Sequence, residues 1–311
     1  MLEPRLSPLG RALPVVWQDA LVAQARGLGP AALLADLILS YPPDPYGLDP
    51  ARAKQSFFLV EQTIGRYFRL QVMGAERIPP GRALVIGRHS GVLPWDAACL
   101  VPAIYRHTGR FSRNAGDALW GRFAPVARYL AARGVVLGPA AELEELLRQD
   151  EIVLLFHGGV ADMQLPVWER YRVKPHKGFA PGRGGYIKIA LRARSPIVPV
   201  AIVGAEEIHM LVANIQPLAR LLGWPYFPVV VSVPPLPARI YIRFGEPLHL
   251  DAPPEAAEDQ NLVHALNDRV RASLQALIDD TRRHRRGIYW SAYEGDGADD
   301  ALRHVIDRAA A

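Results

Sequence analysis

Two side chains in one short stretch have the types and spacing for proton-transfer chemistry. His89 and Asp96 both lie in the segment Arg88-His-Ser-Gly-Val-Leu-Pro-Trp-Asp96. A neutral imidazole accepts a proton near neutral pH, and a neighbouring carboxylate fixes its tautomer and orientation. We therefore predict that His89 is a general base and that Asp96 positions it. The alternative is that Asp96 is only a first-turn carboxylate, which the helix dipole favours.

The elements around this pair are suited to hold it. Residues 83–87 form an apolar run typical of a buried strand, and an apolar helix pattern begins after Pro94. A loop between a strand and a helix keeps two side chains at a fixed separation. Further strands are expected at residues 134–137, 151–156, 196–203 and 239–244, and helices at residues 97–105, 119–133, 142–148, 186–194, 210–222 and 258–283. This alternation predicts an α/β fold.

The chain divides by composition into three parts. Residues 1–73 carry apolar positions at helical spacing and form an N-terminal helical segment, residues 74–290 form the α/β domain, and residues 291–311 form a tail. The N-terminal helices either pack on the domain, which is the default expectation, or lie on a bilayer.

Composition excludes several classes of protein and site. The chain of 311 residues contains one cysteine, Cys99, which excludes disulfide scaffolds and cysteine-based metal sites. Its apolar surroundings favour a buried structural thiol over a nucleophile. No histidine spacing indicates a metal. The longest uncharged stretch, residues 221–238, contains five prolines, so we expect no membrane-spanning helix. The N-terminus does not resemble a signal peptide, and we expect a cytoplasmic protein.

The net charge of +5 favours anionic partners. Candidates are anionic lipid headgroups, the phosphates of coenzyme A and an acidic acyl carrier protein. Nucleic acid is not expected, because the basic residues are dispersed and no nucleic-acid motif is present. The exception is the cluster at residues 282–286, Arg-Arg-His-Arg-Arg. It suits either a lipid surface or the C-terminus of a helix.

The block His89-Ser90-Gly91-x-Leu-Pro-x-Asp96 resembles the first motif of the PlsC-like glycerolipid and lysophospholipid acyltransferases. Six residues separate the histidine from the aspartate, as in a longer bacterial version of the usual four-residue spacing. Other blocks follow in the family's order, and the resemblance covers about residues 44 to 285. They are Trp168-Glu-Arg-Tyr-Arg172, Gly182-Arg-Gly-Gly-Tyr186, Ser195-Pro-Ile-Val-Pro-Val200, Gly204-Ala-Glu-Glu207 and Ile240-Tyr-Ile-Arg-Phe-Gly-Glu-Pro247.

The resemblance implies a mixed, largely parallel sheet flanked by helices and an O-acyltransferase activity in lipid metabolism, such as phospholipid biosynthesis. A fatty acyl group would pass from acyl-CoA or an acyl carrier protein to a hydroxyl of a lipid or lipid-like acceptor. No further cofactor is implied, and the protein would lie peripherally on the inner face of the cell membrane.

The resemblance also suggests residues that bind substrate. Arg88, where the family commonly has asparagine, faces either donor phosphates or solvent. The backbone N–H groups of Ser90 and Gly91 are candidate donors to the oxyanion. Arg183, in a glycine-rich stretch, is expected to bind a phosphate or headgroup. A serine-hydrolase triad is not expected, because adjacent Ser90 and His89 side chains rarely align and no nucleophile elbow is present.

One block departs from the family. The second motif, Phe-Pro-Glu-Gly, is replaced by Phe156-His157-Gly158-Gly159. Because the family's glutamate is associated with acceptor binding, its absence suggests either an acceptor without phosphate or a lipid-binding pseudoenzyme that has lost turnover. His157, Gly158 and Gly159 remain candidate acceptor-side residues. His157 either replaces a polar function there or is an ordinary histidine at a strand end.

Overall fold

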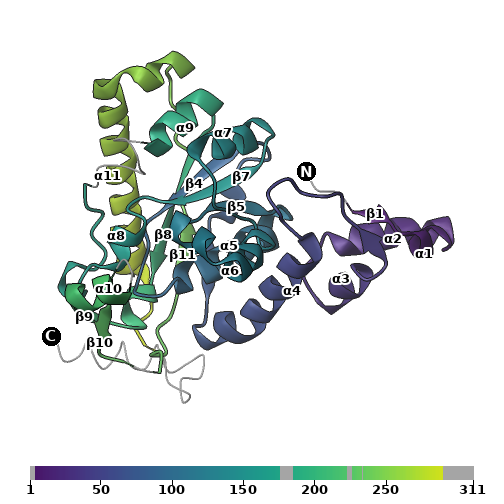
Figure 1. Cartoon of the computed structure of the whole chain (residues 1–311), viewed down its shortest axis with the longest axis horizontal. Coiled ribbons are helices and arrows are strands. Elements are labelled where there is room, and N and C mark those ends of the chain that lie inside the picture. Colours follow the sequence, from purple (N-terminus) through teal and green to yellow (C-terminus); the bar gives the residue numbers. More distant parts are fainter. Residues whose placement is uncertain (1–3, 176–184, 223–225, 233, 290–311) are drawn as a thin grey trace.

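A seven-stranded mixed sheet forms the centre of the computed structural model, which describes residues 4–175, 185–222, 226–232 and 234–289 (Figure 1). The strand order is β3-β11-β8-β4-β7-β5-β6, and only β11 runs antiparallel to a neighbour, β8. The prediction of an α/β fold with a largely parallel sheet is confirmed. The strands are β3 (Gln71–Met73), β4 (Ala83–Gly87), β5 (Ser112–Ala115), β6 (Val135–Val136), β7 (Ile152–Phe156), β8 (Ile197–Val203) and β11 (Tyr241–Phe244).

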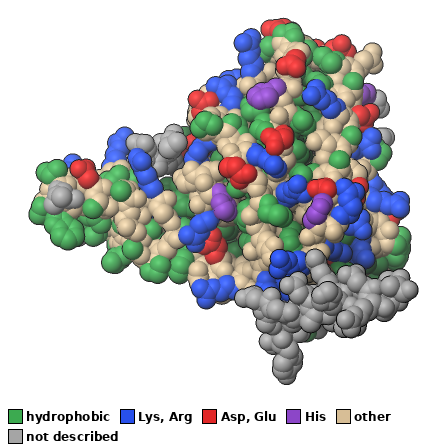
Figure 2. Space-filling model, turned by 180° about the vertical axis from the view of Figure 1, so that it is seen from behind, with side chains coloured by type: hydrophobic (Ala, Val, Ile, Leu, Met, Phe, Trp, Pro, Cys, Tyr) green, Lys and Arg blue, Asp and Glu red, His purple; other side chains and the backbone are tan. Residues whose placement is uncertain are grey.

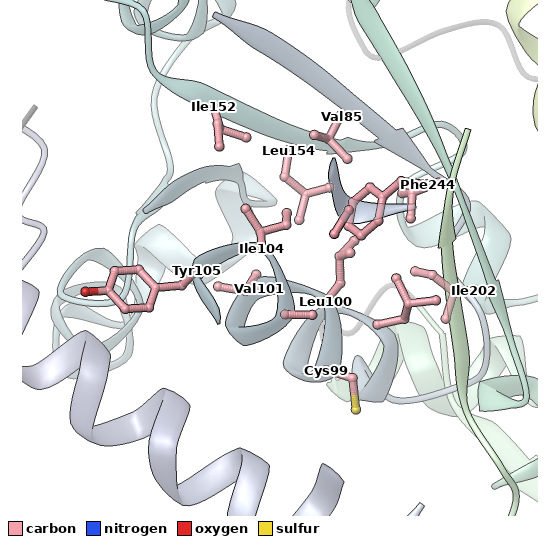
Figure 3. Packing of buried hydrophobic residues seen from close by; sticks show 14 of the residues in the cluster. Val85, Cys99, Leu100, Val101, Ile104, Tyr105, Ile152, Leu154, Ile202 and Phe244 are labelled. Atoms are coloured by element: carbon pink, nitrogen blue, oxygen red, sulfur yellow. The ribbon is translucent and has the colours of Figure 1, made fainter. Parts of the chain in front are cut away.

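Helices cover both faces of this sheet. Val85 packs in one hydrophobic cluster with Leu100 and Ile104 of α5, whereas Leu84 packs in another with residues of α7, α9 and α11. Figure 3 shows Val85, Leu154 and Phe244 close to α5. Because β4 is buried on both faces, its sequence is a continuous apolar run. The helices after the first forty residues include α4 (Pro50–Val60), α5 (Trp95–Thr108), α6 (Ala124–Ala131), α7 (Ala140–Arg148), α8 (Val160–Met163), α9 (Gly185–Ala193) and α11 (Gln260–His284).

Residues 4–40 form a small helical unit that projects from the sheet (Figure 1). It contains its own apolar cluster around Ala25, Ala35 and Leu39. Its elements are β1 (Arg5–Leu6), α1 (Pro8–Arg11), α2 (Val15–Ala25), α3 (Pro30–Ala35) and β2 (Leu39–Ser40). The predicted segment boundary falls at residue 73, but β3 pairs with β11 in the central sheet.

Two predicted helices are wrong in part. The expected helix at 119–133 is divided into a short 3₁₀ helix, Ala118–Arg122, and the separate helix α6. The division occurs because Pro125 suits the start of a helix and not its interior. In place of the expected helix at 210–222, the chain forms β9 (Leu211–Asn214) and then the shorter helix α10 (Gln216–Leu222). β9 pairs with β10 (Pro228–Val230), which follows α10. Pairing with a distant strand overrides the local apolar pattern. Among the described residues, no helix is long and apolar enough to cross a membrane.

Candidate active site

His89 and Asp96 meet at the carboxyl end of β4. His89 follows the last strand residue by two positions, and Asp96 lies in the first turn of α5. The imidazole Nδ1 is 2.8 Å from the Asp96 Oδ2. The strand and the helix therefore bring together the two side chains that the sequence singled out.

Hydrogen bonds from the backbone hold the Asp96 carboxylate. The Ser90 N–H donates to Oδ2 at 2.7 Å, and the Ala97 N–H donates to Oδ1 at 2.7 Å. An ionised carboxylate only accepts hydrogen bonds, so the neutral His89 carries its proton on Nδ1 and its lone pair on Nε2. The side chain of Asp96 is 1% exposed and that of His89 is 16% exposed. The buried carboxylate thus orients a base that solvent reaches.

The ring of Phe156 fixes the plane of the imidazole. The two rings stack with their centroids 3.7 Å apart and an interplanar angle of 10°. Phe156 ends β7, which pairs in parallel with β4 so that Phe156 lies opposite Gly87. Sequence reasoning did not assign a role to Phe156 in the site. The feature of the sequence that could have indicated such a role is the position of Phe156 at the end of a neighbouring strand.

Ser90 and Gly91 shape the loop. The Ser90 N–H is bonded to Asp96 and the Ser90 hydroxyl donates to the Ile202 carbonyl oxygen at 3.1 Å, so both groups have protein partners instead of facing substrate. Gly91 has φ +93°, and a Cβ there would lie 2.5 Å from the Ala205 carbonyl oxygen. Glycine is required because the loop passes against the end of β8.

The prediction that Arg88 faces a donor phosphate or solvent is wrong, because Arg88 contacts carboxylates inside the protein. It is 3% exposed. Its guanidinium pairs with the carboxylate of Glu206, and the Asp162 Oδ1 is 3.9 Å away. Glu206 lies in a short 3₁₀ helix, Ala205–Glu207, after β8. A buried arginine is stable when paired in this way, and the pair joins the ends of β4 and β8.

The substituted second motif builds a closed turn after β7. His157 is 3% exposed, its N–H donates to the Gly87 carbonyl oxygen at 2.7 Å, and its Nε2 is 3.2 Å from the Lys174 carbonyl oxygen. The Gly158 N–H donates to the Asp162 Oδ2 at 2.9 Å. A Cβ at position 158 would lie 2.2 Å from the Asp162 Oδ1. Asp162 therefore occupies the space of a side chain at 158, while Gly159 takes φ +54°.

The other candidate residues lie elsewhere. Arg183 is outside the described residues. Within the basic cluster, Arg285 pairs with the buried Glu207 at 2.9 Å, and Arg283 pairs with Asp280 at 3.0 Å. Cys99 is buried, which raises the pKa of its thiol to about 12. In the part of the chain that the structure describes, no group of three or more His, Cys, Asp or Glu side chains is placed to hold a metal ion.

Comparison with known proteins places this chain in a family. The uncharacterized protein Rv0502 of Mycobacterium tuberculosis is 32% identical over 290 residues, which cover 87% of this chain and 76% of the relative. The chain belongs to the Rv0502 family. No family model matches it.

More distant similarities extend beyond the Rv0502 family. The mouse protein named "DGAT1/2-independent enzyme synthesizing storage lipids" is 26% identical over 217 residues, covering 68% of this chain and 60% of that protein. The crystal structure of the 1-acyl-sn-glycerophosphate acyltransferase PlsC from Thermotoga maritima covers 76% of this chain and 83% of its own, with 16% identity and a TM-score of 0.44.

Proposed function

We propose that this member of the Rv0502 family is a lipid O-acyltransferase. Its donor would be the thioester of acyl-CoA or of an acyl carrier protein, and its acceptor a hydroxyl of a lipid or lipid-like molecule. The acceptor oxygen attacks the thioester carbonyl carbon while His89 Nε2 takes the hydroxyl proton. The carbon–sulfur bond then breaks, and the departing thiolate receives the proton from His89.

The observation that carries this proposal is the geometry of His89. The hydrogen bond from Nδ1 to Asp96 leaves Nε2 as the basic nitrogen, and Asp96 stabilises the imidazolium that forms during the attack. Phe156 and the two backbone N–H groups on Asp96 hold this arrangement before substrate arrives. General-base assistance of this kind contributes about 10²- to 10⁴-fold to the rate.

Two similarities in sequence support the proposed class of reaction. The His89-to-Asp96 block resembles the first motif of the PlsC-like acyltransferases, and a relative across 68% of this chain is named for the synthesis of storage lipids. The second motif supports an acceptor without phosphate, because Gly158 replaces the family's glutamate and Asp162 fills the space beside it.

A catalytically impaired lipid- or acyl-binding protein is the second candidate. The observation that favours it is the same closed turn, in which Asp162 bonds to Gly158 and faces Arg88 and so presents no carboxylate to solvent. The presence of a complete His89–Asp96 pair favours the enzyme, since a binding module does not require that pair.

We further propose a peripheral association with the cytoplasmic membrane face. Large apolar side chains are exposed on the projecting N-terminal unit, where Trp17 is 63% and Leu37 is 72% exposed. Figure 2 shows the same lobe extending from the body with hydrophobic side chains at its tip. Apolar and aromatic side chains of this kind insert at the boundary between headgroups and acyl chains.

The test is thiol release from a panel of acyl-CoA and acyl carrier protein thioesters. Each donor is assayed alone and with diacylglycerol, a long-chain alcohol or lysophosphatidic acid. The wild type is compared with His89→Ala and with His107→Ala, a control at an exposed histidine in the last turn of α5. Circular dichroism melting establishes that all three proteins are folded.

We expect acceptor-dependent release that falls at least 10²-fold in His89→Ala and stays within twofold in His107→Ala. Faster release with diacylglycerol or alcohol than with lysophosphatidic acid supports the acceptor without phosphate. If no combination supports release while the folded protein binds acyl thioester or lipid, the second candidate replaces the first.

A further inference from the structure

A cavity lined by basic side chains lies outside the loops that hold His89 and Asp96. It has a volume of about 510 Å³ between residues 167–172 and the C-terminal half of α11, and its lining includes Trp168, Arg170, Arg172 and Arg282. This volume is within the range of small-molecule and cofactor sites. Figure 2, seen from behind, shows Lys and Arg side chains gathered on the side of the molecule where α11 lies.

The loop that carries these residues is held in a strained conformation. Tyr171 has φ +65°, which is unfavourable for a bulky residue. Its N–H donates to the Glu206 Oε2 at 2.7 Å, its hydroxyl bonds to Glu207, and its carbonyl oxygen accepts from the Gln275 side chain at 3.0 Å. Such strain persists only where surrounding contacts enforce it, and it concentrates at functional sites. Anchoring Tyr171 inward leaves its neighbours Arg170 and Arg172 lining the cavity.

Basic side chains outnumber acidic ones in the described lining of the cavity. Arg282 is 3.6 Å from Asp279, and its guanidinium lies 4.7 Å from the centre of the Tyr171 ring. Within the described ranges, neither Arg170 nor Arg172 has a carboxylate at ion-pair distance. Among the described residues that line the cavity, Asp279 is the one acidic side chain, beside the guanidinium groups of Arg170, Arg172 and Arg282. A guanidinium group binds phosphate through two parallel hydrogen bonds to two of its oxygens.

The basic cavity has residues in common with a small cavity beside the His89 loop. Val167 and Arg170 also line a second, much smaller cavity of about 10 Å³, whose lining includes Gly91 and Val92. Glu206 joins the two loops, because it bonds to Arg88 next to His89 and to the N–H of Tyr171. The basic cavity thus shares part of its lining with a smaller cavity beside the His89 loop.

We propose that this cavity binds the 3′-phospho-ADP end of a coenzyme A thioester, an inference that rests on the proposed acyltransferase function. The guanidinium groups of Arg170, Arg172 and Arg282 bind the phosphates, and the indole of Trp168, which is 68% exposed, stacks on the adenine. A lipid headgroup carries one phosphate and no aromatic ring, so it matches fewer of these groups.

The test is equilibrium binding to the full chain by calorimetry. The probes are coenzyme A, 3′-dephospho-coenzyme A, 3′,5′-ADP and lysophosphatidic acid. The variants are Arg170→Gln/Arg172→Gln and Trp168→Leu, with Arg128→Gln as the control at an exposed arginine on α6, distant from α11. His89→Ala is included because it separates binding from turnover.

We expect coenzyme A to bind about tenfold or more weakly to the double variant and about threefold or more weakly to Trp168→Leu, with no change in Arg128→Gln. Loss of the 3′-phosphate weakens binding to the wild type, and 3′,5′-ADP competes with coenzyme A. His89→Ala binds coenzyme A like the wild type. Where turnover occurs, the double variant raises KM for acyl-CoA and leaves kcat within threefold.

The outcomes separate this inference from the proposed function. Equal binding of coenzyme A to the wild type and the double variant overturns the site. So does preferential binding of lysophosphatidic acid that the double variant loses. Thiol release from an acyl carrier protein without coenzyme A binding overturns the site and leaves the acyltransferase standing. Arginine-dependent coenzyme A binding without any thiol release supports the site and contradicts the proposed function.

Discussion

The loops after β4 and β7 each contain a histidine and an aspartate but use them in opposite ways. After β4, Asp96 accepts a hydrogen bond from His89, and the histidine remains accessible. After β7, Asp162 bonds to Gly158 and approaches Arg88, while the buried His157 bonds to the Lys174 carbonyl oxygen. The chemistry of a residue pair therefore depends on which partner the backbone selects, and the first loop is suited to catalysis whereas the second is suited to support.

The largest expected effect comes from exchanging the two aspartates for asparagine. In Asp96→Asn, the amide no longer fixes His89 with a charged acceptor, so acyl transfer should fall about 10²- to 10⁴-fold with the protein still folded. In Asp162→Asn, transfer should stay within about tenfold while stability falls, because the charge facing Arg88 is lost. Thiol-release kinetics and urea denaturation of both variants measure the difference. Equal loss of activity in the two variants contradicts the division of roles.

The second effect concerns the buried ion pair that supports both loops. Arg88→Met leaves the Glu206 carboxylate buried, and we expect the free energy of unfolding to fall by about 3–5 kcal/mol. Removing both charges in Arg88→Met/Glu206→Leu should recover part of that loss, although the bond from Glu206 to the Tyr171 N–H is also removed. A urea double-mutant cycle gives the coupling. Simple additivity of the two single variants would falsify the pairing.

The third effect tests the space beside the second motif. Gly158→Ala places a Cβ against Asp162, which must move, and we expect a loss of about 1–3 kcal/mol from the free energy of unfolding. Gly159→Ala is the matched control. Its Cβ meets no described atom within 4 Å, so it should cost about 1–2 kcal/mol, from the positive φ alone. Thermal and urea unfolding compare them, and a larger cost at Gly159 contradicts the packing around Gly158.

Most of the sheet could be predicted from local patterns, because strands buried on both faces are continuous apolar runs with helices between them. The His89–Asp96 pair could be predicted as well, since its members lie seven positions apart in one short segment. Phe156 and Glu206 required the strand order, which places the ends of β7 and β8 on either side of β4. Arg88 shows the limit most clearly: its burial depends on a carboxylate 118 positions away.

The smallest effect is expected at Ser90. Its hydroxyl donates to the Ile202 carbonyl oxygen, and its side chain is buried, so Ser90→Ala removes one neutral hydrogen bond. We expect a loss of about 1 kcal/mol in unfolding free energy and a rate of acyl transfer within threefold of the wild type.

This variant also distinguishes direct transfer from a covalent route. In direct transfer the acceptor oxygen attacks the thioester, and the Ser90 backbone N–H continues to hold Asp96 in the alanine variant. If Ser90 instead formed an acyl-enzyme, Ser90→Ala would abolish thiol release as completely as His89→Ala. Rapid-quench assays that look for a burst of thiol and for acylated protein decide between the two. Retained transfer without a burst would confine the chemistry of the β4 loop to His89 and leave Ser90, through its backbone, a residue that positions Asp96.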